Sequence, residues 1–239
     1  MNNRIDLHTH SIAAGHAYST FQENVQAAFE KGLSVYGFSE HGPAMPGGPH
    51  PFFFQNFRVL PEEYKGMRIL KGCEANIIDL EGHLDLEDSI LAHMDYVIAS
   101  MHPPCVTPGS AAENTDCLIK IMDHPAVQII GHPDDARFPL EYDRLVQAAK
   151  EKGVLLEVNN SSLSPVSVRK GGLENVQAYL TLCKEYGVPV ILGTDSHCAP
   201  QIGDFTYADK VLKDMEFPEE LVVNTNLELL KRFVPRVLE

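Results

Sequence analysis

The chain has 239 residues, of which 44% are hydrophobic and 22% charged, so a disordered protein is excluded and a sizeable core can be buried. No run of about 18 apolar residues occurs, which excludes a membrane-spanning helix. The 19 basic and 33 acidic residues give a net charge of −14, which argues against a nucleic-acid polymer as the main partner.

The amino terminus and the cysteines both indicate a cytoplasmic protein. Residues Met1 to Arg4 lead into an apolar run without the hydrophobic region of a signal peptide. Five cysteines, with no Cys-x-x-Cys pair, are odd in number and typical of reduced thiols. One domain over residues 1–239 is expected, and the sequence leaves open whether it forms a homo-oligomer.

Seven short apolar runs predict strands that are buried on both faces, as in a parallel sheet. Their starts are spaced by about 30 residues, the length of one strand–helix unit. Seven such units predict either a barrel or an open doubly wound sheet, and periodicity does not decide between the two. The runs are Ile5–Leu7, Val35–Phe38, Ile69–Leu70, Tyr96–Ala99, Val127–Ile130, Val154–Val158 and Val188–Leu192.

Helices are predicted between these strands by their caps and apolar stripes. Thr20 with Glu23, and Ser110 with Glu113, have the spacing of capping boxes. Leu173 to Cys183 forms another apolar stripe, which Gly187 closes.

One connection, from Gly42 to Gly66, is unusually long and rich in Pro, Gly and Phe. A loop of this length inside a compact domain is often functional. Alternatively, its phenylalanines pack on the barrel and have a structural role.

Polar residues stand at the carboxyl ends of six of the seven strands. Because residues i and i+2 of a strand share one face, His8 and His10 point the same way, as do Asp195 and His197. In an α/β barrel all such ends meet at one mouth. His16 lies six residues past His10, in the loop that leaves the first strand. The complete set is His8, His10, His16, His41, Glu74, His102, His132, Asp195 and His197.

Seven histidines with two carboxylates suit zinc, iron or manganese, and the lack of thiolates argues against a closed structural zinc site. Any one of these histidines alone would more often be a packing residue. It is improbable, however, that polar residues end six of the seven buried strands by chance. His50, His83, His93 and His124 have no strand-end position and are interpreted as surface or packing residues.

The chain resembles the PHP (polymerase and histidinol phosphatase) superfamily over essentially its whole length, and most closely its small bacterial YcdX-like phosphatases. The resemblance implies a distorted seven-stranded (β/α)7 barrel with three divalent metal ions, commonly zinc, with manganese or iron in some members. Glu40 stands where many relatives have Asp, and we expect it to point away from His41. The matching motifs are Asp6–His10, Ser39–Gly42, Gly72–Glu74, Ala99–His102, Gly131–Pro133 and Thr194–His197.

Carried over position by position, the resemblance assigns each ion its ligands. The first ion takes His8, His10, Glu74 and Asp195. The second takes Glu74, His102 and His132, so that Glu74 bridges the pair. The third takes His16, His41 and His197.

The function expected from this set is metal-dependent hydrolysis of a small phosphoester, with a bridging hydroxide that attacks phosphorus in line. Glu74, Asp195 and His197 are the expected catalytic residues. Arg169, Lys170 and Arg58 are candidates for substrate binding, although a solvated surface charge is the commoner role for each.

Four other functions remain open. Histidinol-phosphate phosphatase is the nearest alternative, followed by a phosphodiesterase or exonuclease of the same superfamily. An amidohydrolase often needs a bridging Lys at the end of the fourth strand, where Met101 and His102 stand. A metal-holding module without catalysis would not need the complete ligand set.

Overall fold

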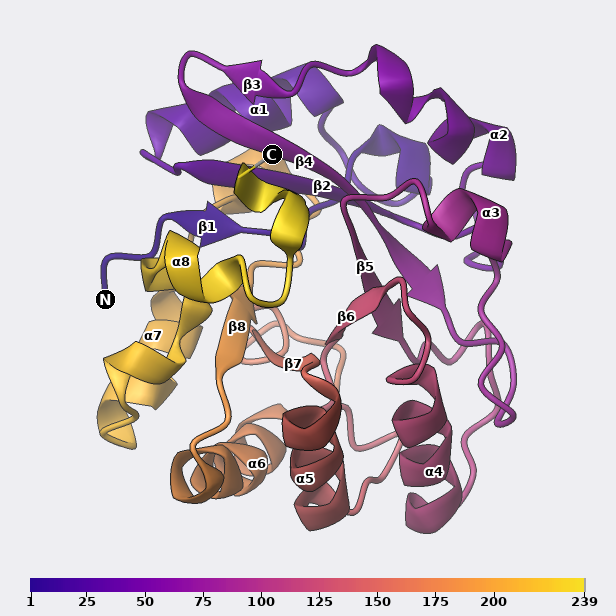
Figure 1. Ribbon diagram of the computed structural model, residues 1–239, viewed down its shortest axis with the longest axis vertical. Helices are drawn as coiled ribbons and strands as arrows, with labels where there is room; N and C mark the ends of the chain where they lie inside the picture. Colours follow the sequence, from indigo (N-terminus) through magenta and orange to yellow (C-terminus); the bar gives the residue numbers. More distant parts are fainter. Residues whose placement is uncertain (239) are drawn as a thin grey trace.

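Seven parallel strands form a nearly closed barrel in the computed structural model, which describes residues 1–238 (Figure 1). Neighbouring strands follow one another in chain order, and a two-residue strand, β3 (Glu63–Tyr64), pairs antiparallel with the start of β4. This arrangement confirms the predicted α/β barrel, and every apolar run overlaps a strand. The parallel strands are β1 (Ile5–Asp6), β2 (Val35–His41), β4 (Met67–Asn76), β5 (Tyr96–Ser100), β6 (Val127–Ile130), β7 (Leu155–Asn159) and β8 (Val190–Gly193).

The barrel closes between its first and last strands through a short seam. Beyond the end of β1, Thr9 pairs with Ser196 in a single parallel bridge. Further down the seam, Asn224 Nδ2 donates to the carbonyl oxygens of Ile5 and Leu192 at 2.8 Å, and its Oδ1 accepts from the Leu192 amide at 2.7 Å. This one side chain therefore supplies hydrogen bonds that a longer strand pairing would otherwise make.

Large apolar side chains fill the inside of the barrel. The carboxyl-terminal segment, which contains α8 (Leu227–Leu230) and a 3-10 turn over Pro235–Leu238, packs on them. A barrel interior filled in this way is a core and not a pore, so room for a site remains at the carboxyl ends of the strands. The inner cluster comprises Ile5, Leu7, Val35, Leu70, Tyr96, Ile98, Ile129, Leu155 and Ile191 from the strands, with Val223, Leu230, Val234 and Val237 from the carboxyl-terminal segment.

Five helices of nine to fifteen residues cover the outside of the strands. Both predicted capping boxes are confirmed, at Thr20 and at Ser110, and the helix predicted to end before Gly187 does so. None of the described helices is both long and apolar enough to span a membrane. The five are α1 (Phe21–Glu30), α4 (Ala111–Ile121), α5 (Tyr142–Lys152), α6 (Gly172–Tyr186) and α7 (Thr206–Asp214), and α4, α5 and α6 stand side by side in Figure 1.

The aromatic connection from Gly42 to Gly66 packs on the barrel. It forms α2 (Pro51–Gln55), a 3-10 turn over Asn56–Val59, and β3. Phe54 and Phe57 are only 1% and 5% exposed, and the Phe57 ring lies 5.5 Å from that of Phe38 on β2. Phe52, by contrast, is 67% exposed. Most of this segment therefore serves as an outer layer over β2 and β4.

Candidate metal centre

The strand-end residues meet at the carboxyl mouth of the barrel. His41 and Glu74 are register partners on β2 and β4. His8 and His10 follow β1, His102 follows β5, His132 follows β6, and Asp195 and His197 follow β8. Seven of the nine are buried, whereas His197 is half-buried and His16 is exposed at the outer edge.

Glu74 lies at the centre of the cluster, with five imidazoles around its two carboxylate oxygens. Oε1 is 3.3 Å from Nε2 of His8, 3.3 Å from Nε2 of His102 and 3.0 Å from Nε2 of His132. Oε2 is 3.4 Å from His10 Nε2 and 2.7 Å from His41 Nδ1. Both oxygens of this carboxylate thus face nitrogen donors, as a bridging ligand requires, with His8 and His10 beside different oxygens.

Asp195 joins the cluster from the opposite side of the barrel. Its Oδ1 lies 3.6 Å from His8 Nε2 and 3.2 Å from His10 Nε2. Its Oδ2 accepts from the Arg169 guanidinium at 2.8 Å. Each oxygen of this carboxylate therefore has a different set of neighbours.

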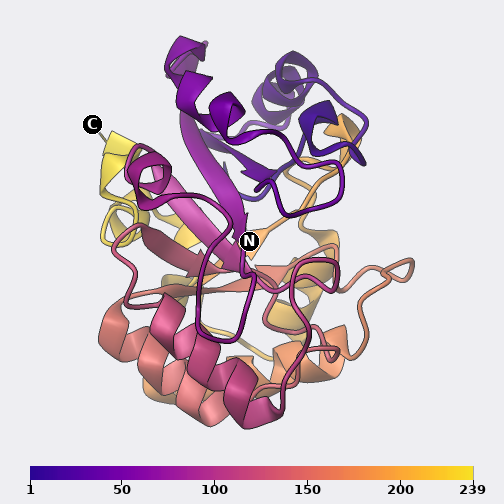
Figure 2. The same ribbon diagram turned by 90° about the vertical axis from the view of Figure 1, so that its right-hand side faces the viewer.

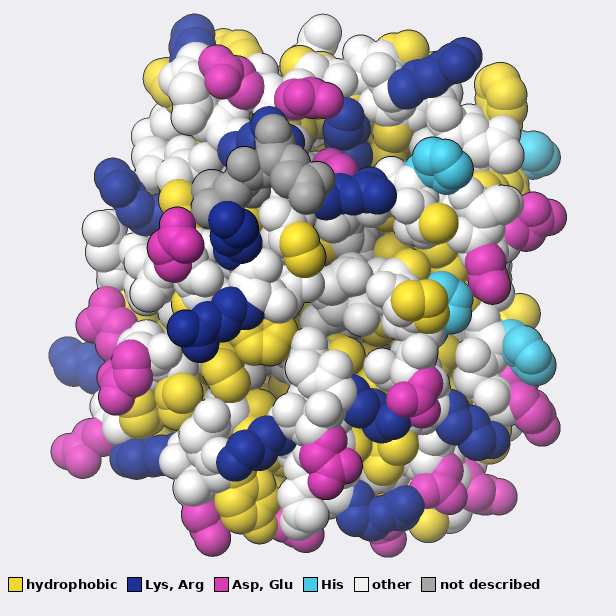
Figure 3. Space-filling model, viewed as in Figure 1, with side chains coloured by type: hydrophobic (Ala, Val, Ile, Leu, Met, Phe, Trp, Pro, Cys, Tyr) yellow, Lys and Arg dark blue, Asp and Glu magenta, His cyan; other side chains and the backbone are white. Residues whose placement is uncertain are grey.

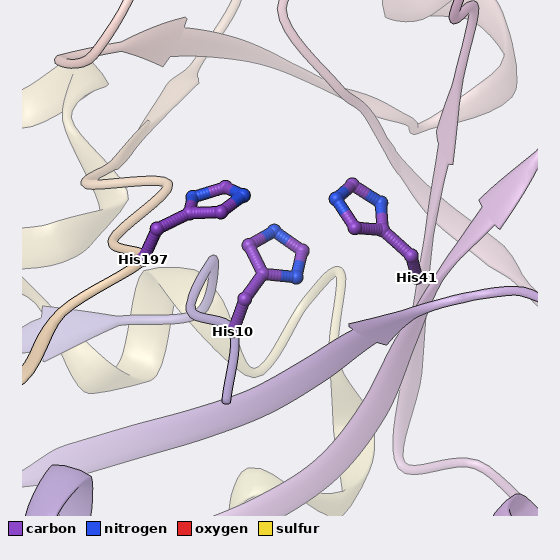
Figure 4. Close-up of side chains that lie close together, drawn as sticks. All are labelled: His10, His41 and His197. Carbon is purple, nitrogen blue, oxygen red and sulfur yellow. The ribbon is translucent and has the colours of Figure 1, made fainter. Parts of the chain in front are cut away.

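A second group of donors lies toward the solvent. His10, His41 and His197 come from three separate segments, and Figure 4 shows their rings gathered around a shared space. Their donor atoms all lie within 4.8 Å of one another. The His16 ring stands beside this group, with its centroid 5.1 Å from that of His41 and 4.9 Å from that of His197.

Two of the predicted ligands have an unfavourable backbone conformation. His132 has φ 28° and Asp195 has φ 51°, a region that non-glycine residues rarely adopt. Such strain typically persists at functional sites, where the surrounding structure holds it in place. Here it turns the side chains that follow β6 and β8 toward Glu74.

Burial and mutual contact set the charge states of these groups. Burial alone would raise the pKa of Glu74, but His8, His41 and His102 lower it well below its usual value. The pKa of Asp195 is likewise held low, against its burial, by His8 and Arg169. Burial and the neighbouring His41 lower the pKa of His10, and burial lowers that of His102 although Glu74 opposes it. Against its burial, Glu157, Glu74 and Asp195 raise the pKa of His8 well above its usual value. Ionised carboxylates beside the neutral forms of His10 and His102 suit metal binding, and a metal ion would displace the proton of His8.

Several nitrogen and oxygen atoms that could bind a metal in this cluster are buried without a hydrogen-bond partner among the described residues. They include both ring nitrogens of His10, Nε2 of His8 and Oδ1 of Asp195. Nδ1 of His41 and Oε2 of Glu74 also belong to this set, because their 2.7 Å contact lacks the angles of a hydrogen bond. Polar atoms left unpaired at this depth are costly unless a bound group satisfies them. The cluster therefore fits transition-metal ions, which nitrogen and carboxylate oxygen donors bind well.

Residues behind the cluster orient the ligands, and two of them were not predicted from the sequence. Glu157 on β7 lies 2.6 Å from His8 Nδ1 and accepts from the His132 amide at 2.7 Å. Asn76 Oδ1 lies 2.8 Å from His102 Nδ1. A lone charged residue inside an otherwise apolar strand was the available signal for Glu157.

Glu40 does point away from His41, as expected. Its Oε1 accepts from the Ser11 amide at 2.5 Å, and its Oε2 lies 4.0 Å from His10 Nδ1. Burial raises the pKa of this carboxyl to about 7. Glu40 therefore sits behind His10, on the side opposite Glu74.

The three predicted substrate contacts lie in different places. Arg169 lines a cleft of about 620 Å³ that opens over the cluster, and it also donates to Asn159 and Ser162. Lys170 is exposed and does not line this cleft, and Arg58 lines another cleft near the carboxyl terminus. Arg137, which the sequence reading did not select, lines the mouth and is ion-paired with Asp135.

The segment between β7 and α6 forms one wall of this cleft. It projects from the body of the molecule at the right of Figure 2. Val166 and Val168 on it are 87% and 83% exposed, and both line the cleft.

A family model described as the PHP domain matches residues 6–161. The chain belongs to the PHP domain family. A Clostridium botulinum (strain Okra) protein named "Probable phosphatase" is 49% identical over 235 residues, which cover 97% of this chain and 96% of that protein. A Caldanaerobacter subterraneus protein with a similar name is 45% identical over 231 residues, covering 96% and 90%. These names confirm the predicted enzyme class, a phosphoester hydrolase.

A solved structure of another PHP-type protein supports the fold. The histidinol phosphate phosphatase of Lactococcus lactis, determined with zinc, L-histidinol and phosphate, superposes with a TM-score of 0.64 at 21% identity. The match covers 90% of this chain and 95% of that one. At this level of identity the likeness confirms the PHP barrel and leaves the substrate of this chain open.

Proposed function

We propose that this PHP-family protein is a metal-dependent phosphatase that hydrolyses a small phosphomonoester at the carboxyl mouth of its barrel. The observation that carries the proposal is the convergence of five imidazoles on the two oxygens of the buried Glu74. A carboxylate held in this way is suited to bridge two ions, and paired ions are a common device for phosphoester hydrolysis.

The proposed ions are three divalent transition metals, with zinc first and manganese or iron as alternatives. Glu74 and Asp195 would hold one ion with His8 and His10, and Glu74 would share a second with His102 and His132. The third would lie among His16, His41 and His197. His41 and His197, two of the three ligands proposed for the third ion, have donor atoms within 4.8 Å of one another and of His10.

Bound ions would supply charge neutralisation for the phosphate and a water of lowered pKa. The chain supplies the geometry. Glu157 fixes the His8 ring, and Asp195 holds Arg169 at the cleft floor by one oxygen while its other oxygen faces His10. Because a guanidinium has five N–H donors, Arg169 keeps capacity for a phosphate oxygen in addition to its protein partners.

The cleft over the cluster favours a small substrate. Its volume of about 620 Å³ is within the range that metabolite-sized ligands occupy. The net charge of −14 would weaken the approach of a nucleic-acid polymer.

All five cysteines are free, which supports the proposed cytoplasmic location.

The test combines elemental analysis with an activity screen on one preparation. Protein purified with zinc, manganese or iron is expected to retain close to three ions per chain. It should hydrolyse phosphomonoesters, with histidinol phosphate included in the panel, and lose this activity with a chelator. The control is His83→Ala, which removes an imidazole that is 70% exposed and outside the cluster.

Three results would contradict parts of this proposal. One ion or none in metal-replete protein would reject the trinuclear site. Full metal content without hydrolysis of any phosphoester would favour a non-catalytic metal-binding role. Activity on amides or lactones would indicate amidohydrolase chemistry.

A further inference from the structure

A second cleft lies on the outside of the barrel, where its helical cover is thin. The connection between β4 and β5 contains only the four-residue helix α3 (Asp88–Leu91), and that between β2 and β4 contains only α2, a 3-10 turn and β3. A cleft of about 610 Å³ remains between these segments and the carboxyl-terminal turn. Figure 3 views this face, which is hollowed where these segments meet.

This outer cleft is separate from the candidate metal centre. The two clefts have no lining residue in common. Lys71 lines the outer cleft from β4, three residues before Glu74 on the same strand. Because Glu74 faces the barrel interior, an odd offset along the strand turns Lys71 to the outside.

The base of the outer cleft is apolar. Phe54, Phe57, Ile90 and Met94 line it, and each is at most 6% exposed. They come from α2, the following 3-10 turn, α3 and the residues just before β5. The exposed parts of these four side chains give the cleft an apolar base.

The edge of the outer cleft is cationic. Arg58, Lys71 and Arg236 line it, against one carboxylate, Asp95. Arg58 has no ion pair among the described residues, and Lys71 Nζ is 3.9 Å from Glu62, which is itself 69% exposed. Arg236 Nη1 is 3.6 Å from Asp95 Oδ1, so three cations face two carboxylates, Glu62 and Asp95. The excess of one positive charge belongs to Arg58, on a chain of net charge −14.

We propose that the outer cleft binds a small organic anion with an apolar body, at a site distinct from the metal centre. A free inorganic anion would pair with the cations but leave the apolar base of the cleft exposed to water. A neutral hydrocarbon would exclude water from Arg58, which has no ion pair among the described residues, and burying such a charge is costly. A molecule that carries both parts satisfies both surfaces, and the volume suits one of metabolite size.

The proposal can be tested with 8-anilinonaphthalene-1-sulfonate, an aromatic anion, on metal-loaded protein. Methionine methyl groups labelled with carbon-13 report where it binds, because Met94 lines the outer cleft and Met45 lines the mouth of the metal centre. Substitution of each by Leu assigns the two signals. We expect saturable binding that shifts the Met94 methyl, leaves Met45 unchanged and persists in excess inorganic phosphate.

Two variants at exposed positions test the two halves of the proposed recognition. Arg58→Glu reverses an edge charge and should weaken binding by about tenfold, which corresponds to about 1.4 kcal/mol. Ser89→Trp places a large side chain at the cleft and should weaken binding without a change of charge. The matched control is Lys213→Glu, the same reversal at an exposed position on α7 that does not line the cleft.

Three outcomes would overturn the proposal. A shift confined to Met45, or displacement of the probe by phosphate, would place the binding at the metal centre. Equal affinity in Arg58→Glu and Lys213→Glu would remove the role of the cationic edge. Lack of saturable binding at millimolar concentrations of the probe would show that the outer cleft takes no such anion.

Discussion

Glu74 and Glu157 are both fully buried acidic residues inside the barrel, yet they have different neighbours. Glu74 faces the imidazole Nε2 atoms of His8, His102 and His132. Glu157 instead faces the other nitrogen of the His8 ring and a backbone amide. Opposite nitrogens of one imidazole thus face two carboxylates, as in sites where one orients the ring and the other shares the ion.

The shared position of Glu74 leads to a test of the metal count. Glu74→Ala should release about two ions per chain and abolish turnover, because both ions of the pair lose a ligand. His16→Ala should release about one ion and leave residual activity, because His16 lies at the exposed edge. Glu74→Gln should fall between the two. Elemental analysis after gel filtration decides, and loss of the same single ion from Glu74→Ala and His16→Ala would reject the bridge.

The contact between Glu157 and His8 leads to a different expectation. Glu157→Gln keeps the shape of the side chain but removes the charge that orients the His8 ring. Loss of such a partner typically lowers metal affinity by about 10- to 100-fold. Competition with a chromogenic chelator measures the affinity, and Glu185→Gln on the surface of α6 is the control. Unchanged metal affinity in Glu157→Gln would show that the charge of Glu157 does not orient the His8 ring.

At the scale of elements, the strands were predictable because both of their faces are buried. Continuous apolar runs identify such strands, and the polar residues that follow them then mark the mouth of the barrel. Glu157 was missed because the alternation of a strand does not reveal which buried charge contacts a ligand. Arg58 was misplaced because its position depends on how the aromatic connection folds, and no periodic pattern encodes that fold.

The aromatic connection provides a matched pair of phenylalanines, two residues apart, for a stability test. Both residues are on α2, where Phe54 is 1% exposed and Phe52 is 67% exposed. Phe54→Ala should lower the free energy of unfolding by about 3–5 kcal/mol, the usual cost of such a cavity. Phe52→Ala should change it by about 0.5 kcal/mol or less. Urea unfolding measures both, and similar values would show that this segment contributes little packing.

For the whole molecule, the seam between β1 and β8 depends on a residue outside both strands. Asn224 is fully buried, and its side chain pairs with Ile5 and with both backbone groups of Leu192. The carboxyl-terminal segment that follows it also packs on the inner core. Closure of the barrel and cover of its base are thus achieved by one stretch of chain.

Loss of this side chain should therefore destabilise the entire barrel. Asn224→Ala leaves two carbonyl oxygens and one amide without partners, each at a cost of about 1–3 kcal/mol. We expect a loss of about 3 kcal/mol or more in the free energy of unfolding. Asn224→Asp has nearly the same size but loses both donors, and it should be at least as destabilising. A thermal unfolding midpoint close to that of the parent protein for either variant would contradict this role for the seam.

The same seam has a consequence for how the protein is made. The Ile5 carbonyl accepts its hydrogen bond from Asn224, which lies 219 residues later in the chain. At about 5–20 residues per second, the ribosome needs about 10 to 45 s to synthesise that interval. Throughout this time the edge of β1 has no partner at its base, and an unpaired edge can pair with other chains. The seam of the barrel therefore cannot be completed until Asn224 has been synthesised, and until then the nascent chain can aggregate through the base of β1.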